Sequence, residues 1–586
     1  MDTIPSLLLS LVDDVPEREL VHTPAGKDGE QWLWQSWSLA QIRDQISGLA
    51  RRLHALGVST ATPVAVYAET SHEWMAIDLA VLCLGGVTVG IYPSLTGQQA
   101  AWQLRHSAAT ALIVDTQERY DRLAPLLDEL DSLVHVFSIG PVRGAIQLHP
   151  AEPDPDFLAN RARRVRPEDA AAVVYTSGTT GEPKGAVLTH RCLVATARAS
   201  QELLPMREGD RSILYLPMAH ILQRIVGYRG LMEGAAGWFA PSLDDLPALL
   251  VQTRPTVLAV VPRVLEKIKS RAEATAAARG PVSAAVLGWA VAVGRSAAAA
   301  ERQGRPLPRR LLLQRALAER LVYQTIRDRL GGALRLVVSG GAALSPDVLT
   351  WFEAIGISVR EGWGLTETAG PATLNPAATC RPGSVGLPLP HTELRLTDDG
   401  ELLVRGAGLF SGYLHDEEAT AAAFTDDGFY RTGDLGVIDD DGYVWIIGRR
   451  KELLITAGGK NVAPVPIERK LEEARLIDQV VLTGDGRPFL SVLLWLDEDH
   501  LAEQAAAGSW PGSEAAWRTR QSVHTAVQHH IDAVNATLAP FESVKRFAFF
   551  SAPLSVAGGE LTPTLKLRRA HITQKYAALI DALYKA

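Results

Sequence analysis

The chain is short of cysteine, of long apolar runs and of positive charge. Its 586 residues contain three cysteines, Cys83, Cys192 and Cys380, which lie far apart and have no CxxC spacing. This argues against a disulfide framework or a structural zinc site and favours a reducing compartment. The formal net charge is −8, so we do not expect a general nucleic-acid-binding protein.

No stretch of the sequence predicts a membrane span or a signal peptide. The longest nearly apolar run extends from Pro281 to Gly294 and ends at Arg295, which is too short to cross a bilayer. The N-terminal stretch MDTIPSLLLSLVDDVPEREL has no basic start and becomes acidic after its apolar part. We therefore expect a cytoplasmic protein.

The length and the pattern predict an α/β protein of at least two domains. Helical spacing alternates with strand-like runs, which is typical of a doubly wound sheet; the helices are expected at 38–58 and 74–86, and the strands at 63–69, 87–93 and 110–114. From about residue 393 the sequence becomes rich in short strands and Asp-Gly turns. We predict a large N-terminal domain, 1–448, made of doubly wound sheets plus a β-rich subdomain, and a small mobile α+β C-terminal domain, 449–586.

Residues 263–330 form a helical, basic segment. They contain 14 Lys and Arg against 5 Asp and Glu, a local balance of +9. The simpler interpretation is a solvated helical face. The alternative is peripheral contact with an anionic membrane surface.

The stretch YTSGTTGEPKG, residues 175–185, gathers small and hydroxyl residues around one lysine directly after an apolar run. Glycine allows backbone N–H groups to approach an anion, and Ser, Thr and Lys add donors. The pattern suits a polyphosphate, but it lacks the Walker A spacing. From these residues alone an ordinary surface turn remains the alternative.

Companion motifs resolve this ambiguity because six of them follow in order. They are LPMAHILQRI (216–225), VSGGAALS (338–345), EGWGLTET (361–368), YRTGDLG (430–436), GRRKELLITAGGKN (448–461) and LTPTLKLRR (561–569). Together with YTSGTTGEPKG they resemble the adenylate-forming superfamily over essentially the whole chain. PTVLAVVPRVLEKI (255–268) and GGALRLVVSGGAAL (331–344) are similar to long-chain fatty acyl-CoA synthetases within it.

This resemblance implies a role for each residue of the nucleotide site. The β- and γ-phosphates and the leaving pyrophosphate would be held by Thr176, Ser177, Gly178, Thr179, Thr180, Gly181 and Lys184. Further nucleotide contacts would come from Glu361, Gly362, Trp363, Gly364 and Thr366. Glu367 would be the Mg²⁺ ligand. Trp363 stands where the family usually has tyrosine; an indole can still stack on adenine, with core packing as the alternative.

The resemblance also implies roles in ribose binding, domain movement and catalysis. Asp434 would accept the ribose hydroxyls, Arg449 would bind ribose or phosphate, and Lys451 would be the hinge between domains. Lys566 matches the catalytic lysine of adenylation.

Two further groups of residues would accommodate the acyl chain and CoA. His220 would line the acyl pocket and gate it or assist thioester formation, unless it is an ordinary core histidine. Small residues, Gly341 and Ala342, would leave room for the acyl chain. Gly458 and Gly459 would lie in the path of the pantetheine arm.

The combined prediction is a ligase that joins a medium- or long-chain fatty acid to CoA. ATP and Mg²⁺ would give acyl-adenylate and pyrophosphate, and CoA would then displace AMP. The alternatives are an acyl-AMP ligase that loads a carrier protein and a non-catalytic lipid- or nucleotide-binding relative. The expected partners are fatty acid, ATP and CoA but no nucleic acid, and a homodimer is an option because dimers occur among the relatives.

Overall fold

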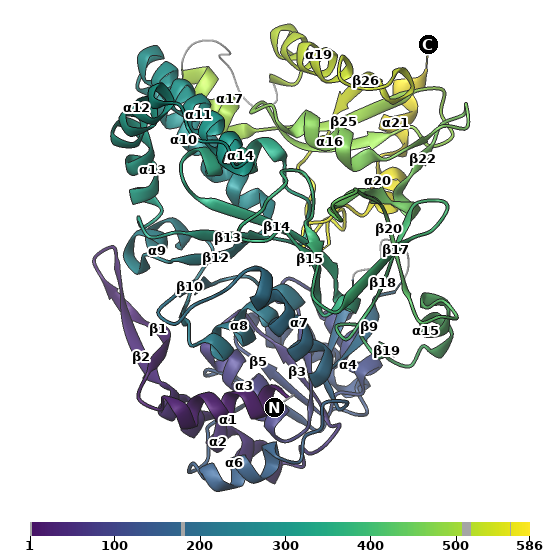
Figure 1. The fold of residues 1–586 in the computed structure, drawn as a ribbon. Helices are drawn as coiled ribbons and strands as arrows, with labels where there is room; N and C mark the ends of the chain where they lie inside the picture. The colour runs from purple at the N-terminus through teal and green to yellow at the C-terminus, as the bar shows by residue number, and fades with distance from the viewer. Residues whose placement is uncertain (1–2, 177–181, 507–516, 563, 586) are drawn as a thin grey trace.

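The computed structural model describes residues 3–176, 182–506, 517–562 and 564–585. Figure 1 shows a large body that begins at the N-terminus and a smaller C-terminal part, coloured light green to yellow, against its upper side. The predicted mixed α/β class, with a separate C-terminal domain, is confirmed. Helices α2 (Leu39–Ala55) and α3 (His72–Cys83) lie where helical spacing predicted them.

The first sheet has eight strands, and its central strands are parallel. In strand β3 (Pro63–Tyr67), neighbouring residues pack into different cores. Val64 and Val66 face helices α1 (Ile4–Asp14), α2 and α3, whereas Ala65 and Tyr67 face helix α4 (Gly97–Ser107). A strand covered on both faces needs a continuous apolar run, as PVAVY provides. In spatial order the strands are β19 (Gly412–Tyr413), β9 (Lys184–Thr189), β8 (Ala170–Thr176), β4 (Val87–Ile91), β3 (Pro63–Tyr67), β5 (Ala111–Val114), β6 (His135–Ser138) and β7 (Ile146–Gln147). The helices of this region are α1 (Ile4–Asp14), α4 (Gly97–Ser107), α5 (Gln117–Leu123), α6 (Pro155–Ala162) and α7 (His190–Leu203), with α2 and α3.

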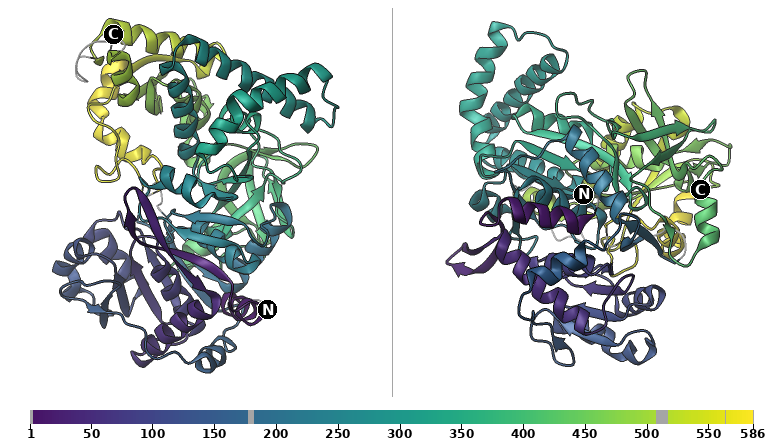
Figure 2. Two further views of the ribbon diagram at one scale, coloured as in Figure 1. Left: turned by 90° about the vertical axis from the view of Figure 1, so that its left-hand side faces the viewer. Right: turned by 60° about the horizontal axis from the view of Figure 1, so that its bottom comes forward.

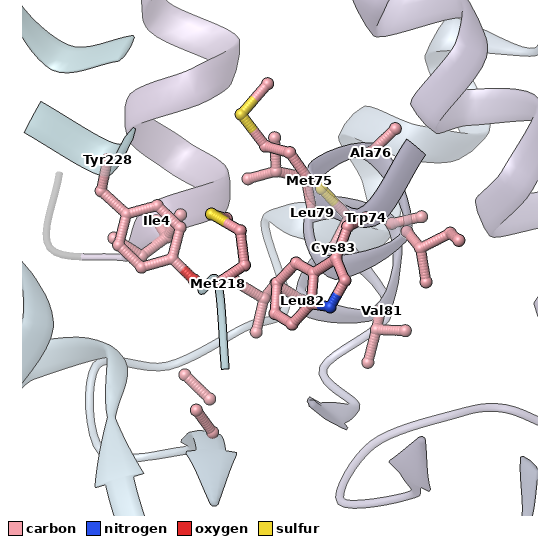
Figure 3. Close-up of a cluster of buried hydrophobic side chains, with 14 of the residues drawn as sticks. Ile4, Trp74, Met75, Ala76, Leu79, Val81, Leu82, Cys83, Met218 and Tyr228 are labelled. Carbon is pink, nitrogen blue, oxygen red and sulfur yellow. The ribbon is translucent and has the colours of Figure 1, made fainter. Parts of the chain in front are cut away.

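Helix α3 is buried on nearly all sides. Figure 3 shows Trp74, Leu79 and Leu82 of this helix among side chains of other elements, including Met218 and Tyr228. A helix that is apolar all round is expected only inside a core. Met218, in the loop that leads to His220, belongs to the same core, so this loop is packed against α3.

The second sheet has five strands, of which the first three are parallel. They are β12 (Val257–Val260), β13 (Leu336–Ser339), β14 (Ser358–Leu365), β15 (Gly370–Leu374) and β16 (Leu387–Pro388). Its helices and those of the basic segment are α8 (Ile221–Glu233), α9 (Leu246–Thr253), α10 (Pro262–Ala278), α11 (Pro281–Arg302), α12 (Arg309–Ala318), α13 (Gln324–Arg329) and α14 (Pro346–Ala354). Short connections at 279–280 and 303–308 separate α10, α11 and α12 in the basic segment.

Two smaller sheets complete the N-terminal body. One contains β10 (Arg211–Leu214), β11 (Ala236–Phe239), β1 (Glu19–Asp28) and β2 (Gln31–Ser38). The other is the predicted β-rich subdomain, with β17 (Thr392–Leu396), β18 (Glu401–Gly406), β20 (Tyr430–Ile438) and β21 (Val444–Arg449), next to α15 (Glu417–Ala423).

The C-terminal part has its own cores. Every hydrophobic cluster of the described residues draws its members from one side of Arg449 only. The strands are β22 (Leu454–Ile455), β23 (Asn461–Val462), β24 (Ile477–Thr483), β25 (Leu490–Leu496) and β26 (Val544–Phe549). The helices are α16 (Pro464–Glu472), α17 (Glu498–Ala506), α19 (Gln521–Asn535), α20 (Arg569–Lys575) and α21 (Ala577–Tyr584).

A fully buried ion pair joins α8 to α3. Arg224 and Asp78 both have no exposed side-chain surface, and a guanidinium nitrogen of Arg224 contacts Oδ1 of Asp78. Tyr228 donates its hydroxyl to Oδ2 of Asp78 at 2.6 Å. The pair satisfies charges that could not be buried singly. It anchors α8, whose N-cap is His220.

We predict that Asp78→Ala lowers the free energy of unfolding by about 3–5 kcal/mol, because it leaves the Arg224 charge buried without a counterion. Chemical denaturation followed by tryptophan fluorescence measures the change. Asp427→Ala, which breaks an exposed pair with Arg395, is the matched control and is expected to cost at most about 1 kcal/mol. Equal losses in the two variants would contradict the argument.

Candidate functional site

The phosphate loop connects two antiparallel strands at the end of the first sheet. Thr176 ends β8, Lys184 begins β9, and the two residues pair across the hairpin. The Thr176 hydroxyl donates to the Lys184 carbonyl at 3.3 Å. The predicted contacts Ser177, Gly178, Thr179, Thr180 and Gly181 lie outside the described residues. The loop follows the carboxyl end of β8, where α/β sheets usually bind ligands.

Lys184 faces a carboxylate and an aromatic ring. Its Nζ lies 3.6 Å from Oδ2 of Asp416 and 4.9 Å from the ring centre of Tyr413. Tyr413 belongs to β19, which pairs with β9, and Asp416 follows this strand. Sequence motifs did not single out Tyr413 or Asp416, because the pairing of β19 with β9 spans more than 220 residues.

Glu367 follows β14 and is buried, with 8% of its surface exposed. The Tyr413 hydroxyl donates to Oε1 of Glu367 at 2.8 Å. Burial raises the pKa of the Tyr413 hydroxyl, and the Glu367 charge raises it further, so Tyr413 remains a donor. Thr366 lies beside Glu367 in the same short 3₁₀ turn, Thr366–Thr368.

Asp434 is held by two donors from different elements. The indole Nε1 of Trp363 donates to Oδ2 at 2.7 Å, and Nε of Arg449 lies 2.8 Å from Oδ1. Asp434 is 3% exposed and pairs with Arg449 across β20 and β21. Charge-assisted bonds of this kind fix the plane of a carboxylate. Trp363 thus has a polar role that its place in the motif did not predict.

Lys566 lies in a hairpin loop of the C-terminal domain that reaches these groups. Its carbonyl accepts the Thr562 N–H at 2.8 Å, and its own N–H donates to the Thr562 hydroxyl at 3.0 Å. The side chain keeps accessible surface but is surrounded by protein. Burial and the nearby Arg449 cation lower the pKa of Lys566, while Asp434 and Glu367 oppose that shift.

His220 is a neutral histidine at the start of α8. Burial, and then the Lys566 charge, lowers its pKa to about 4. The Leu222 N–H donates to Nδ1 at 3.1 Å, so the ring proton resides on Nε2. The ring of Tyr92 lies edge-on to the His220 ring, with 6.4 Å between ring centres.

Glycines 362 and 364 have a structural reason to be glycine. A Cβ at Gly364 would collide with the Gly370 carbonyl, and one at Gly362 would collide with Leu374 of β15. These residues allow β14 and β15 to approach closely. The predicted contacts Gly341 and Ala342 follow β13 and are exposed, so they are open to a ligand.

Glu361 supports the loop after β13. It is 2% exposed, and it accepts the Leu344 N–H at 2.8 Å. Burial raises its pKa to about 7, although the Leu344 N–H and the Arg469 cation oppose the shift. Glu361 therefore holds this loop in place, and its nucleotide contact stays a prediction.

Gly458 and Gly459 are not brought to the other site residues in this arrangement. They form the exposed turn between β22 and β23, and Ala457 in that turn donates to the Arg487 carbonyl within the C-terminal domain. Lys451 is exposed in the 3₁₀ turn Arg450–Glu452 directly after β21. The structure thus shows the orientation in which the Lys566 loop, not the glycine turn, faces the N-terminal domain.

Polar contacts hold this orientation. Arg263 of α10 contacts the Asp478 carboxylate and donates to the Asp478 carbonyl at 3.1 Å. The Ser345 hydroxyl donates to Glu473 at 3.1 Å. Both contacts join the N-terminal body to the C-terminal domain.

Fold and site define a two-domain enzyme in which one carboxylate-rich nucleotide site receives a lysine from the second domain. The AMP-binding enzyme family matches residues 17–414, and the AMP-binding enzyme C-terminal domain matches residues 451–586. The chain belongs to this family of AMP-binding enzymes.

Two curated relatives cover most of the chain. The long-chain-fatty-acid–CoA ligase FadD15 of Mycobacterium bovis is 36% identical over 563 residues, covering 94% of this chain and 93% of that protein. The long-chain-fatty-acid–CoA ligase ACSBG1 of Rattus norvegicus is 31% identical, covering 94% of this chain and 82% of that protein.

Solved structures share the fold. The adenylation domain of a carboxylate reductase from Mycobacterium chelonae aligns with a TM-score of 0.78 and 20% identity, covering 99% of this chain and 91% of that one. The anthranilate CoA ligase AuaEII, solved with anthranoyl-AMP, aligns with a TM-score of 0.73 and 21% identity, covering 99% and 98%.

We predict that Arg263→Ala loosens the C-terminal domain, because it removes the ion pair and the carbonyl contact with Asp478. Tryptic cleavage at Arg450 and Lys451 should become about three- to tenfold faster, the range expected for a partly exposed charged contact. Asp478→Ala alone should also speed cleavage, but adding it to Arg263→Ala should increase the cleavage rate less than it does in the wild-type chain. Additive effects of the two changes would contradict a direct coupling. Arg279→Ala, at an exposed arginine with no ion pair in the described parts of the chain, is the control.

Proposed function

We propose that the chain is an AMP-forming ligase that converts medium- or long-chain fatty acids to acyl-CoA. The observation that carries this proposal is the convergence of Lys566, Asp434 and Glu367 from separate motifs and both domains. The curated relatives support the fatty acid and CoA as substrates. ATP and fatty acid would first give acyl-adenylate and pyrophosphate, and CoA would then release AMP.

The charges suit the first step. A carboxylate that attacks the α-phosphate brings two anions together, so cations must stabilise the transition state. Lys184 would bind the β- and γ-phosphates together with Thr176, and Lys566 would stabilise charge at the α-phosphate and the attacking carboxylate. Asp434, oriented by Trp363 and Arg449, would accept the ribose hydroxyls. The bound geometry would lower the barrier by proximity.

Mg²⁺ fits the site if the phosphates supply most of its ligands. Mg²⁺ usually takes one or two carboxylates and completes its shell with phosphate and water. Glu367 offers such a carboxylate: Oε1 accepts from the Tyr413 hydroxyl, and the Tyr430 hydroxyl also lies against this carboxylate. When bound, the ion would neutralise phosphate charge.

The second step needs a different orientation of the C-terminal domain. We propose that the domain boundary lies at 448/449 and that Lys451 is the hinge, so that rotation withdraws Lys566 and brings Gly458 and Gly459 to the acyl-adenylate. The absence of a shared hydrophobic core across Arg449, among the described residues, supports such a rotation.

Two alternative functions would differ from this one in their products. A ligase that loads an acyl carrier protein would form the same acyl-adenylate, and a binding protein would form none. Incubation with ATP and fatty acids of increasing length, with and without CoA, distinguishes them. Acyl-CoA and pyrophosphate in equal amounts are expected; acyl-adenylate without acyl-CoA would favour the carrier. We also propose a cytoplasmic location and a homodimer.

We predict that Lys566→Ala slows acyl-adenylate formation about 10²–10³-fold, the typical loss for removal of one transition-state charge partner. Thioester formation from supplied acyl-adenylate should remain nearly unchanged, since that step uses the other orientation. Single-turnover assays of each half-reaction measure the two rates. Equal losses in both would remove Lys566 from its assigned role.

The pH profile tests the same lysine. The protonated form is the active one, so the adenylation rate should fall as pH rises. Because burial and Arg449 lower the Lys566 pKa, the fall should be centred below the ordinary lysine value of about 10.4. Lys566→Arg should remove this fall, even if its rate is lower.

We predict that Trp363→Phe raises KM for ATP about tenfold with a smaller effect on kcat, because the ring is kept but the bond to Asp434 is lost. Discrimination between ATP and 2′-deoxy-ATP should decrease as well. Trp445→Phe is the matched control, since Trp445 donates to Asp439 at 3.4 Å in the same subdomain. Unchanged KM and unchanged discrimination in Trp363→Phe would show that the bond has no role in ribose binding.

A further inference from the structure

Helices α11, α12 and α13, residues 281–329, form an outer helical arm. Figure 2 shows this arm, in teal, projecting beyond the sheets at the edge of the molecule in both views. Helix α12 packs against α11 on its inner side. Its outer side is exposed, as at Arg309, Leu313 and Leu317.

The outer side of the arm carries large apolar residues. Leu313 is 74% exposed, Leu317 is 50% exposed and Leu321 is 53% exposed. Leu313 and Leu317 lie one turn apart on the same side of α12, and Leu321 lies in the π-helical turn Glu319–Tyr323 that continues this helix. Contiguous exposed apolar residues on a soluble chain usually mark an interaction site.

Arginines without counterions surround these leucines. Arg305, Arg309, Arg310 and Arg320 are exposed and have no ion pair within the described residues. The acidic residues nearby are already engaged: Glu301 pairs with Arg315 at 2.5 Å, and Glu319 pairs with Arg327. The outer side is therefore basic and apolar at once, although the whole chain carries a charge of −8.

Helix α11 supports the arm and is not itself the contact surface. It is long and apolar enough to cross a bilayer by composition, which the shorter apolar run in the sequence did not indicate. However, a Cβ at Gly294 would collide with the Ala354 carbonyl of α14, and Arg295 contacts Asp347 at 2.5 Å. These contacts hold α11 against the body.

We propose that the outer side of α12 is a docking surface for an anionic lipid bilayer. Leu313, Leu317 and Leu321 would enter the boundary between headgroups and acyl chains, and the arginines would bind lipid phosphates while their stems cover apolar surface. An amphipathic helix needs no groove in its partner, which suits a convex, projecting arm. The contact would bring the enzyme to the phase in which fatty acids accumulate. This benefit rests on the proposed function, but the contact does not require catalysis.

The size of the surface favours a bilayer over a stable protein partner. A specific protein interface buries at least about 1,200 Å² and usually has an apolar centre. Three leucines on one narrow helix, with arginines between them, offer less. An anionic bilayer matches both the leucines and the arginines, because the leucines can insert shallowly while the arginines are attracted to the lipid charge.

Vesicle sedimentation tests the proposal with the full-length protein and no substrates. We expect binding to vesicles of phosphatidylcholine and phosphatidylglycerol, weaker binding in high salt, and little binding to phosphatidylcholine alone. Leu313→Ser/Leu317→Ser and Arg309→Gln/Arg310→Gln/Arg320→Gln should each reduce bound protein at least about tenfold. Matched controls are Leu243→Ser and Arg163→Gln/Arg164→Gln, which change exposed residues elsewhere.

Each other outcome overturns the proposal. No binding to anionic vesicles would exclude a lipid surface. If both variants still bound anionic vesicles, α12 would not be the membrane-binding surface. A dimer that the leucine variant dissociates, without vesicle binding, would assign the surface to self-association. Acyl-CoA formation from albumin-bound fatty acid should be unchanged in the variants, so a failure of the proposed function would be seen separately.

Discussion

The proposed nucleotide site is organised around one buried carboxylate, Asp434. It receives Trp363 from the five-stranded sheet and Arg449 from the end of the β-rich subdomain, and its charge partly offsets the lowered pKa of Lys566. A single anion therefore connects the last strand of the N-terminal body with the lysine of the C-terminal domain. Arg449 and Lys566 therefore both interact with the same charge.

Residue patterns within short stretches predicted individual helices and strands, because these elements depend mainly on neighbouring residues. The apolar run before the phosphate loop became β8, and the alternation of helices and strands gave the doubly wound sheet. The order of the motifs identified the residues that meet at the site, because the family resemblance carries long-range information. The resemblance did not predict which side chains of distant segments contact one another. The contact of Tyr413 with Glu367 arises because β19 adds to β9 from more than 220 residues away. The bond from Trp363 to Asp434 depends equally on how two sheets meet.

Some motif residues have a clear structural role in addition to the nucleotide contact predicted for them. Glu361 holds the loop after β13 through the Leu344 N–H, and Gly364 allows β15 to approach β14. A motif combines contact residues with the residues that position them, and sequence alone does not separate the two. Burial separates them here: Glu361 is closed off and accepts a backbone donor, whereas Gly341 and Ala342 are open. The positioning residues explain why so long a run, EGWGLTET, surrounds only a few chemical groups.

The polar nature of the domain contact has a physical consequence for turnover. Apolar interfaces gain free energy in proportion to buried area, and a large apolar contact would hold one orientation. Here the described contacts across Arg449 are ion pairs and hydrogen bonds, such as Arg263 with Asp478 and Ser345 with Glu473, and no hydrophobic cluster of the described residues crosses the boundary. Water can replace such contacts at small net cost. Under the proposed two-step reaction, such contacts would hold Lys566 in one orientation and still allow the C-terminal domain to leave it.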